Sequence, residues 1–214
     1  MAYDLKLRVW RGNQDGGDLQ DYTVEVSEGE VVLDALHRLQ ATQSGDLAIR
    51  WNCKAGKCGS CSAEINGRPR LMCMTRLSDF EADETITVTP MRTFPVIRDL
   101  VTDVSFNYRK ARELPYAELG PRDADGKRRM AQVDVERGQE FRKCIECFLC
   151  QDVCHVLRDH NKHESFIGPR YLTYVAALEM HPLDTVDRKY DPLVWLGNKI
   201  GLRNKDNEGR TEPR

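Results

Sequence analysis

Residues 53 to 61 read Cys53-Lys-Ala-Gly-Lys-Cys58-Gly-Ser-Cys61, and Cys73 follows after eleven further residues. The spacing C-x4-C-x2-C with a more distant fourth cysteine is typical of a plant-type [2Fe–2S] centre. The spacers are mostly small residues and lysines, so the backbone can wrap closely and point N–H groups at sulfur. We therefore predict that these four cysteines hold a [2Fe–2S] cluster.

The other four of the eight cysteines lie together in Cys144-Ile-Glu-Cys147-Phe-Leu-Cys150-Gln-Asp-Val-Cys154. In the pattern C-x2-C-x2-C-x3-C, the first three thiolates reach one cubane cluster from a tight loop, and the fourth typically serves a second cluster. Apolar side chains between these cysteines would exclude water and lower the local dielectric. We expect a second iron–sulfur site here, and we expect it to be buried.

Other uses of eight cysteines compete with this interpretation. Disulfides are favoured in small secreted chains, whereas 214 residues can form an ordinary core. Zinc remains an alternative, although structural zinc usually takes two separated C-x2-C pairs and four cysteines in one short loop would crowd a tetrahedral ion. Catalytic thiols need one or two cysteines with a base nearby. Electron transfer is the function that the cysteine pattern favours, with a zinc-stabilised interaction module without a redox role as the competing class.

Composition and charge limit the partners. With 32 basic and 34 acidic side chains the formal charge is −2, so no overall field attracts nucleic acid or anionic lipid. No uncharged apolar run approaches the roughly 20 residues of a membrane span, and the N-terminus shows no apolar signal segment. Any membrane attachment is therefore expected through a partner. Reliance on free thiolates predicts a reducing compartment, namely the cytoplasm or its membrane face.

Outward from the first motif, hydrophobic alternation predicts strands at residues 5–9 and 22–26, joined as a hairpin. A helix is expected over 32–39, with Ser27 and Glu30 spaced as its capping box. Asn66-Gly67 is the strongest short signal for a further hairpin, and residues 86–88 predict one more strand. These elements predict a β-grasp of the plant-ferredoxin type.

Beyond Pro90 the composition changes, and a linker to Pro95 leads into a segment that looks helical. Apolar side chains at spacings of four predict a helix over residues 96–104, and a further helix is expected over 170–180. The predicted fold class is therefore α+β, with an N-terminal plant-ferredoxin-like β-grasp domain followed by a C-terminal α-helical ferredoxin-like domain.

Several stretches resemble one family. They are Trp51-Asn-Cys-Lys-Ala-Gly-Lys-Cys-Gly-Ser-Cys-Ser62, Pro69-Arg-Leu-Met-Cys-Met74, Cys144-Ile-Glu-Cys147, Phe166-Ile-Gly-Pro-Arg170 and His181-Pro-Leu-Asp-Thr185. Together they are similar to the iron–sulfur subunit of succinate dehydrogenase and fumarate reductase, the complex II family, and most of all to its actinobacterial branch. The resemblance covers nearly the whole chain.

The resemblance implies an electron relay between an FAD-bearing subunit, where succinate and fumarate interconvert, and quinone at a membrane-anchor subunit. It implies a [2Fe–2S] domain over 1–94 and a helical iron–sulfur domain over 95–202. The almost wholly polar composition of residues 203–214 predicts a disordered tail. Substrate chemistry is expected on the partner, because this chain has no phosphate-binding loop and no dinucleotide fingerprint. An iron–sulfur subunit of a different flavin dehydrogenase remains an alternative.

The resemblance also implies the ligands of each cluster. In the family, Cys53, Cys58, Cys61 and Cys73 would hold [2Fe–2S], and the cysteines of the second motif divide between two clusters. Cys144, Cys147 and Cys150 would hold three irons of a [4Fe–4S] cluster, while Cys154 would ligate a [3Fe–4S] cluster.

Two features depart from the family pattern. The family has a later C-x2-C-x3-C-P run, whereas no cysteine follows Cys154 here, so an internal segment is expected to be missing near residues 188–190. A chain break there would appear as a Cα spacing unlike the ~3.8 Å of a continuous trans chain. If the deletion is genuine, Cys154 could instead supply the fourth ligand of a lone cubane.

The second departure is His155, which stands where the family usually has proline after the last cysteine of the motif. A histidine beside a cluster could donate to a sulfur or relay protons to quinone. The alternative is an ordinary residue at the start of a helix. His155 is thus a candidate quinone-side residue.

Overall fold

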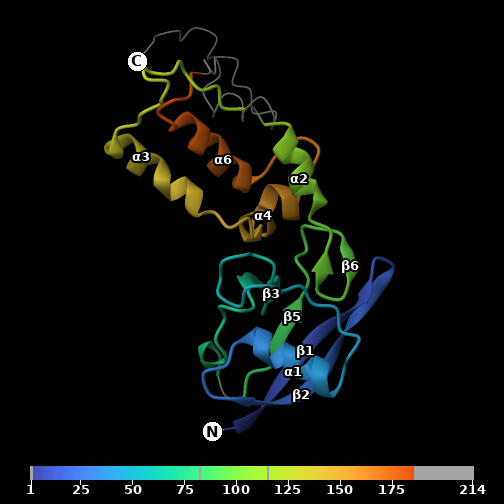
Figure 1. Cartoon of the computed structure of the whole chain (residues 1–214). Coiled ribbons are helices and arrows are strands. Elements are labelled where there is room, and N and C mark those ends of the chain that lie inside the picture. Colours follow the sequence, from blue (N-terminus) through green and yellow to red (C-terminus); the bar gives the residue numbers. More distant parts are fainter. Residues whose placement is uncertain (1, 82, 115, 186–214) are drawn as a thin grey trace.

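The computed structural model describes residues 2–81, 83–114 and 116–185, and Figure 1 shows a sheet region in one half of the molecule and helices in the other. The strands are β1 (Ala2–Asn13), β2 (Gly16–Ser27), β3 (Ser62–Ile65), β4 (Arg68–Leu71), β5 (Ile86–Thr89), β6 (Val96–Arg98) and β7 (Val101–Thr102). The α-helices are α1 (Val32–Thr42), α2 (Ser105–Arg112), α3 (Gln132–Gln139), α4 (Leu149–Asp152), α5 (His155–Arg158) and α6 (Pro169–Glu179). Short 3-10 turns lie at Leu77–Asp79 and Glu140–Lys143.

The sheet forms around β1, which pairs antiparallel with β2 and parallel with β5. Across the described strands the order is β4-β3-β5-β1-β6-β7, with β2 on β1. Leu5, Leu7 and Val9 of β1 are buried while their neighbours face solvent, which confirms the predicted alternation. Helix α1 packs its apolar face on this sheet, and the side chains between them form the main core.

The predicted cap of α1 is wrong in detail. The helix begins at Val32, and the carboxylate of Asp34 accepts a hydrogen bond from Val31 N at 3.2 Å. Glu30 instead forms an ion pair with Arg38 at 2.7 Å, and Ser27 is the last residue of β2. The capping-box spacing is therefore present in the sequence, but Ser27 belongs to β2, and Val31 is the N-cap of the helix.

Both predicted hairpins are present. The β1–β2 pair closes at Asn13 and Gly16, and β3–β4 closes at Ile65 and Arg68. Asn66 and Gly67 have φ of +48° and +73°. Left-handed conformations at both central residues match the right-handed twist of the flanking strands, which is why Asn-Gly is favoured there.

The predicted helix over residues 96–104 is wrong. This segment forms β6 and β7, β6 pairs with β1 at Asn13, and the helix α2 begins only at Ser105. Asp99 lies between the two strands with φ +45°, and its buried carboxylate accepts hydrogen bonds from Gly12 N at 3.0 Å and Ala48 N at 2.8 Å. These distant partners favour a tight turn over a local helix, although the apolar spacing suits a helix.

The helical half has two smaller apolar clusters. Helix α6 matches the predicted helix over 170–180, and its buried Tyr171 and Val175 pack with Leu114 and Ile167. A second cluster lies where the two halves meet, and it consists of Met91, Phe94, Phe106, Phe148, Leu157 and Phe166. The expectations for residues 188–190 and 203–214 lie outside the described residues. No described helix combines the length and apolar character that crossing a membrane requires.

Candidate iron–sulfur sites

The first cysteine loop connects α1 to β3 and holds its thiols near the start of that strand. Cys61 and Cys73 are buried, whereas Cys53 and Cys58 are half-buried. The backbone N–H of Met72 donates to Cys61 O at 3.0 Å, and Met72 O accepts from Leu33 N at 3.1 Å. These bonds connect Cys61 to the segment that carries Cys73, and connect that segment to the first turn of α1.

Backbone N–H groups point at the sulfurs of this loop. Ala55 N and Lys57 N each lie 3.3 Å from Cys53 Sγ, and Ser60 N lies 3.5 Å from Cys58 Sγ. Such bonds stabilise negative charge on sulfur, as a metal-bound thiolate requires. The predicted inward-facing N–H groups are therefore present.

The thiols of this loop influence one another's pKa. Hydrogen bonds from Ser60, followed by those involving Cys53, lower the pKa of Cys58 to about 6. Burial raises the pKa of Cys61 to about 12, and the charges of Cys73 and Cys58 add to the rise. These interactions show that the structure brings all four cysteines of the first motif together.

The second cysteine loop leads into α4, which carries Cys150, and the left-handed residues Glu146 and Phe148 curl it. Loss of hydration around the sulfur, and secondly the charges of Cys147 and Cys144, raise the pKa of the Cys150 thiol, although the residue as a whole is exposed. The structure thus brings these three thiols together. Cys154 begins α5 as its N-cap and packs against the apolar cluster that contains Met91 and Leu157.

The expectation that this second site is buried is wrong for two of its cysteines. Cys144 and Cys150 are exposed residues, and Cys147 is half-buried. Phe148, by contrast, is only 5% exposed because its ring packs with Phe94 and Tyr108, with centroids 6.3 and 5.9 Å away. The apolar residue of the loop turns into the core, which leaves the neighbouring thiols on the outer side.

A buried amide supports the second loop. Gln151, fully buried on α4, donates from Nε2 to Asn107 Oδ1 at 3.0 Å and to Ile167 O at 3.1 Å. Its Oε1 accepts from Arg170 N at 3.2 Å, and the Arg170 guanidinium pairs with Glu146 at 2.6 Å. Sequence reasoning missed this network, because each partner lies far from Gln151 along the chain.

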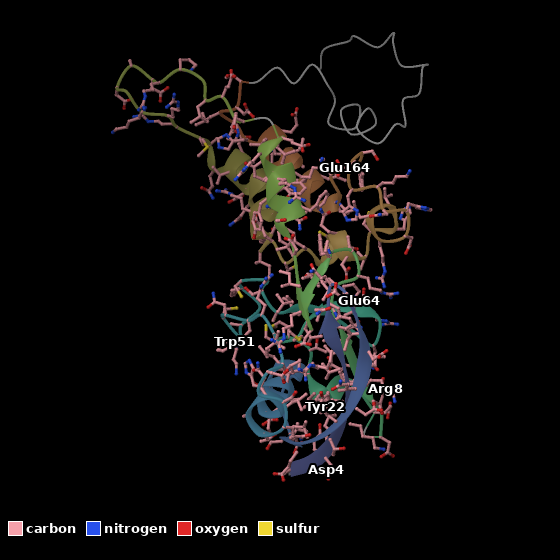
Figure 2. All side chains as sticks on the ribbon, turned by 90° about the vertical axis from the view of Figure 1, so that its right-hand side faces the viewer. Asp4, Arg8, Tyr22, Trp51, Glu64 and Glu164 are labelled. Atoms are coloured by element: carbon pink, nitrogen blue, oxygen red, sulfur yellow. The ribbon has the colours of Figure 1, made fainter. Side chains whose placement is uncertain are left out.

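The two loops touch directly. Ser62, the residue after Cys61, places its hydroxyl 2.8 Å from Cys147 O, and Gly59 lies against the backbone of Cys147. Nearby, Glu64 of β3 is buried and pairs with Arg92 at 3.0 Å and with Arg158 of α5 at 3.2 Å. Figure 2 shows Glu64 at the level where the sheet half meets the helical half.

His155, the candidate quinone-side residue, is the first residue of α5. Its ring lies edge-on to that of His160, with centroids 6.1 Å apart. His155 therefore stands at the start of a helix, as the alternative interpretation expected. A role toward quinone stays a prediction.

The donor set fits iron–sulfur clusters. All eight cysteines are free thiols, so the disulfide alternative is wrong. Within the described residues, no three His, Cys, Asp or Glu side chains are arranged around one point as a single metal ion needs. Clusters of two or more irons share their thiolates among different metal atoms, so their ligands need not meet at one point.

The sheet half holds four cysteines near one another, and a second cysteine loop packs against it. These two features define the class of protein: an electron-transfer iron–sulfur protein. Residues 6–108 match the model of a 2Fe-2S iron-sulfur cluster binding domain.

Relatives identify the family more closely. The chain is 35% identical over 172 residues to the fumarate reductase iron-sulfur subunit of Mycobacterium tuberculosis, covering 79% of this chain and 67% of that protein. It is 32% identical to the subunit of the same name from Wolinella succinogenes, covering 91% of this chain and 83% of that one. It spans only 35% of a longer methanogen relative, a fumarate reductase (CoM/CoB) chain of Methanothermobacter marburgensis.

Among solved structures, a chain of the Mycobacterium smegmatis Sdh1 complex in the apo form superposes with a TM-score of 0.88 at 64% identity. The match covers 97% of this chain and 86% of that chain. The chain therefore belongs to the family of iron–sulfur subunits of succinate dehydrogenase and fumarate reductase. It is an electron-transfer subunit of an oxidoreductase.

Proposed function

We propose that this chain relays single electrons between an FAD-bearing subunit, which interconverts succinate and fumarate, and quinone at a membrane-anchor subunit. The direct contact of two thiol loops, through Ser62 and Cys147, is the observation that supports it best. Electron relays need closely spaced redox centres, and the sequence holds two cysteine sets that the fold brings into contact.

The proposed ligands follow the two motifs. Cys53, Cys58, Cys61 and Cys73 hold the [2Fe–2S] cluster in the N-terminal β-grasp. Cys144, Cys147 and Cys150 hold three irons of a [4Fe–4S] cluster in the helical half, and Cys154 faces a [3Fe–4S] cluster. When bound, these clusters supply one-electron carriers, while the chain's own residues orient the thiolates.

The first loop offers a surface for the flavin-bearing partner. Trp51 and Met74 are 47% and 58% exposed beside this loop. Lys54 Nζ lies 5.4 Å from the Trp51 ring centroid, and the His37 ring packs edge-on against the same ring at 4.7 Å. Exposed apolar side chains with a cation beside them are typical of an interface. Figure 2 shows Trp51 at the side of the sheet half, away from Glu64.

Helix α5, which begins with His155, is proposed to face the anchor subunit and quinone. The complex would then sit at the cytoplasmic face of the membrane, with this chain attached through its partners.

Iron analysis and electron paramagnetic resonance of anaerobically prepared protein test the proposal. The [2Fe–2S] and [4Fe–4S] clusters together predict about six irons per chain. The [3Fe–4S] cluster that Cys154 would face raises the count to about nine, and it requires ligands beyond the eight cysteines. Dithionite should produce two distinguishable signals, one from a [2Fe–2S] centre and one from a cluster at the second loop. A colourless protein containing about two zinc ions instead would overturn the electron-relay function.

A further inference from the structure

A single side chain connects the two thiol loops. Ser62 follows Cys61 directly and is buried at the start of β3. Its Oγ lies 2.9 Å from Gly59 O in its own loop and 2.8 Å from Cys147 O in the second loop. A serine hydroxyl has one hydrogen, so the two carbonyls share it, and both loops are held to the same oxygen atom.

Gly59 makes this approach possible. A Cβ at Gly59 would lie 2.6 Å from Cys147 Cα and 2.8 Å from Cys147 N, closer than real Cβ contacts. Its φ of +70° is also a conformation that other residues rarely adopt. The backbones of the two loops are therefore as close as van der Waals contact allows, and any side chain at position 59 would push them apart.

Other contacts already join the two halves of the molecule. Glu64 pairs with Arg158, and Thr93 N donates to Asp152 Oδ1 at 3.0 Å. The apolar cluster with Phe94 and Phe148 adds burial at the same level. The Ser62 hydrogen bond is thus not required to hold the halves together. Its distinguishing feature is that Ser62 directly follows the proposed ligand Cys61 and donates to the carbonyl of the proposed ligand Cys147.

We propose that Ser62 is a positioning residue of the electron relay, joining Cys61 to Cys147 through one hydrogen bond across the close approach that Gly59 permits. With clusters held by the two cysteine sets, one electron would pass from the first site, which would be oxidised, to the second, which would be reduced. No covalent bond forms or breaks and no proton moves. Electron coupling through bonds decays less steeply than coupling through empty space, so the bridge shortens the effective path.

This inference rests on the proposed function, because it assumes clusters at Cys61 and Cys147. The test uses the full chain with both clusters, reduced by a flash-excited deazaflavin and followed by freeze-quench electron paramagnetic resonance. Ser62→Ala is expected to slow transfer between the clusters several-fold at unchanged iron content. Ser62→Thr, which keeps the hydroxyl, should restore most of the rate.

Thr75→Val is the matched control. Thr75 is also buried and its hydroxyl donates to a carbonyl, Leu71 O at 2.9 Å, yet this bond stays within the sheet half. Its loss should leave the rate unchanged. A Ser62→Ala rate equal to the unmodified rate, in protein that contains both clusters, would overturn the inference and leave the proposed function intact.

A second measurement decides the matter if Ser62→Ala does not keep its iron. Spin relaxation of the reduced first cluster is accelerated by a paramagnetic neighbour, and this acceleration falls steeply with distance. Gly59→Ala, which must push Cys147 away, is expected to weaken this acceleration, so that the signal saturates at lower microwave power. An unchanged saturation profile in Gly59→Ala contradicts the close approach. Absence of either signal in the unmodified protein would instead contradict the proposed function.

Discussion

At the scale of single residues, Asp99 shows how one carboxylate organises distant segments. It is 2% exposed, and its oxygens accept from Arg11 Nε at 3.1 Å and from the backbone of Gly12 and Ala48. Arg11 in turn reaches Asp46 at 2.8 Å on the protein surface. A buried carboxylate is tolerated only when its oxygens are paired in this way.

We predict that Asp99→Ala destabilises the protein by about 3 kcal/mol, since it leaves buried donors without partners. Asp46→Ala is the control, because Asp46 pairs with the same arginine but is 63% exposed. Exposed ion pairs contribute little, because water screens both charges. Urea unfolding of both variants measures the difference, and equal losses would show that burial of Asp99 has no special effect.

The thiols of the first loop should differ in reactivity when no cluster is bound. Only the thiolate is alkylated, so the lowered pKa of Cys58, about 6, makes it reactive at neutral pH, while the raised pKa of Cys61, about 12, keeps that thiol protonated. Brief iodoacetamide treatment of cluster-free protein at pH 7 should therefore label Cys58 well before Cys61, as mapped by mass spectrometry.

The rate at which iodoacetamide labels Cys58 should depend on pH in one direction. Labelling of Cys58 should fall as the pH drops through about 6, because its thiolate is then protonated. Urea-unfolded protein serves as the control, in which both thiols should react alike. Equal labelling of the two cysteines in folded protein would contradict the effect of the Ser60 hydrogen bonds.

At the scale of elements, α4 and α6 support the second loop through Gln151. The side chain connects Asn107 of α2, the segment before α6 and the start of α6 itself. Figure 1 shows α2, α4 and α6 grouped on the same side of the helical half. The loop thus depends on three elements that are far apart along the chain.

We predict that Gln151→Ala costs about 3 kcal/mol of stability, because it leaves several buried polar groups unpaired. Iron at the second site should be lost before iron at the first. Gln132→Ala is the control, since Gln132 on α3 is exposed and its amide donates to Glu136 at 3.0 Å in its own helix. Thermal unfolding and iron analysis provide the readouts, and parallel loss of both clusters would argue against a local role.

At the scale of the whole molecule, the two halves meet through polar pairs around a small apolar cluster. Glu64, Thr93 and Ser62 lie on the sheet side, and Arg158, Asp152 and the second loop lie on the helical side. His163 adds a contact from Nε2 to Thr93 O at 3.0 Å. These directional contacts fix one orientation of the halves, whereas the apolar cluster alone would tolerate sliding.

We predict that Arg158→Ala destabilises the protein by about 2 kcal/mol, because it removes a partner from a buried carboxylate. Arg92→Ala is the matched control: both arginines pair with Glu64, but Arg92 is 62% exposed and Arg158 only 16%. Its loss should cost less than about 1 kcal/mol. Denaturant unfolding compares the two, and a larger effect of Arg92→Ala would reverse this ranking.

Much of the site could be predicted because cysteine spacing is a local property. Cys53, Cys58 and Cys61 lie in one short loop, and Cys144, Cys147 and Cys150 lie in the loop before α4 and in its first turn, so the sequence motif already limits where their sulfurs can be. The hairpin at Asn66-Gly67 and the alternation in β1 are local for the same reason. Family resemblance followed from these motifs, and the relatives confirm it.

Contacts between distant residues could not be predicted in this way. Residues 96–104 have helical spacing, yet Asp99 meets Gly12 and Ala48 and the segment becomes two strands. Nothing in the sequence places Ser62 and Gly59 against Cys147, or turns Phe148 inward so that Cys144 and Cys150 are exposed. Motif spacing specifies which atoms can bind a cluster, because it depends on neighbours along the chain. The tertiary structure decides how the two sites approach each other, because burial and hydrogen bonding depend on partners that only folding brings together.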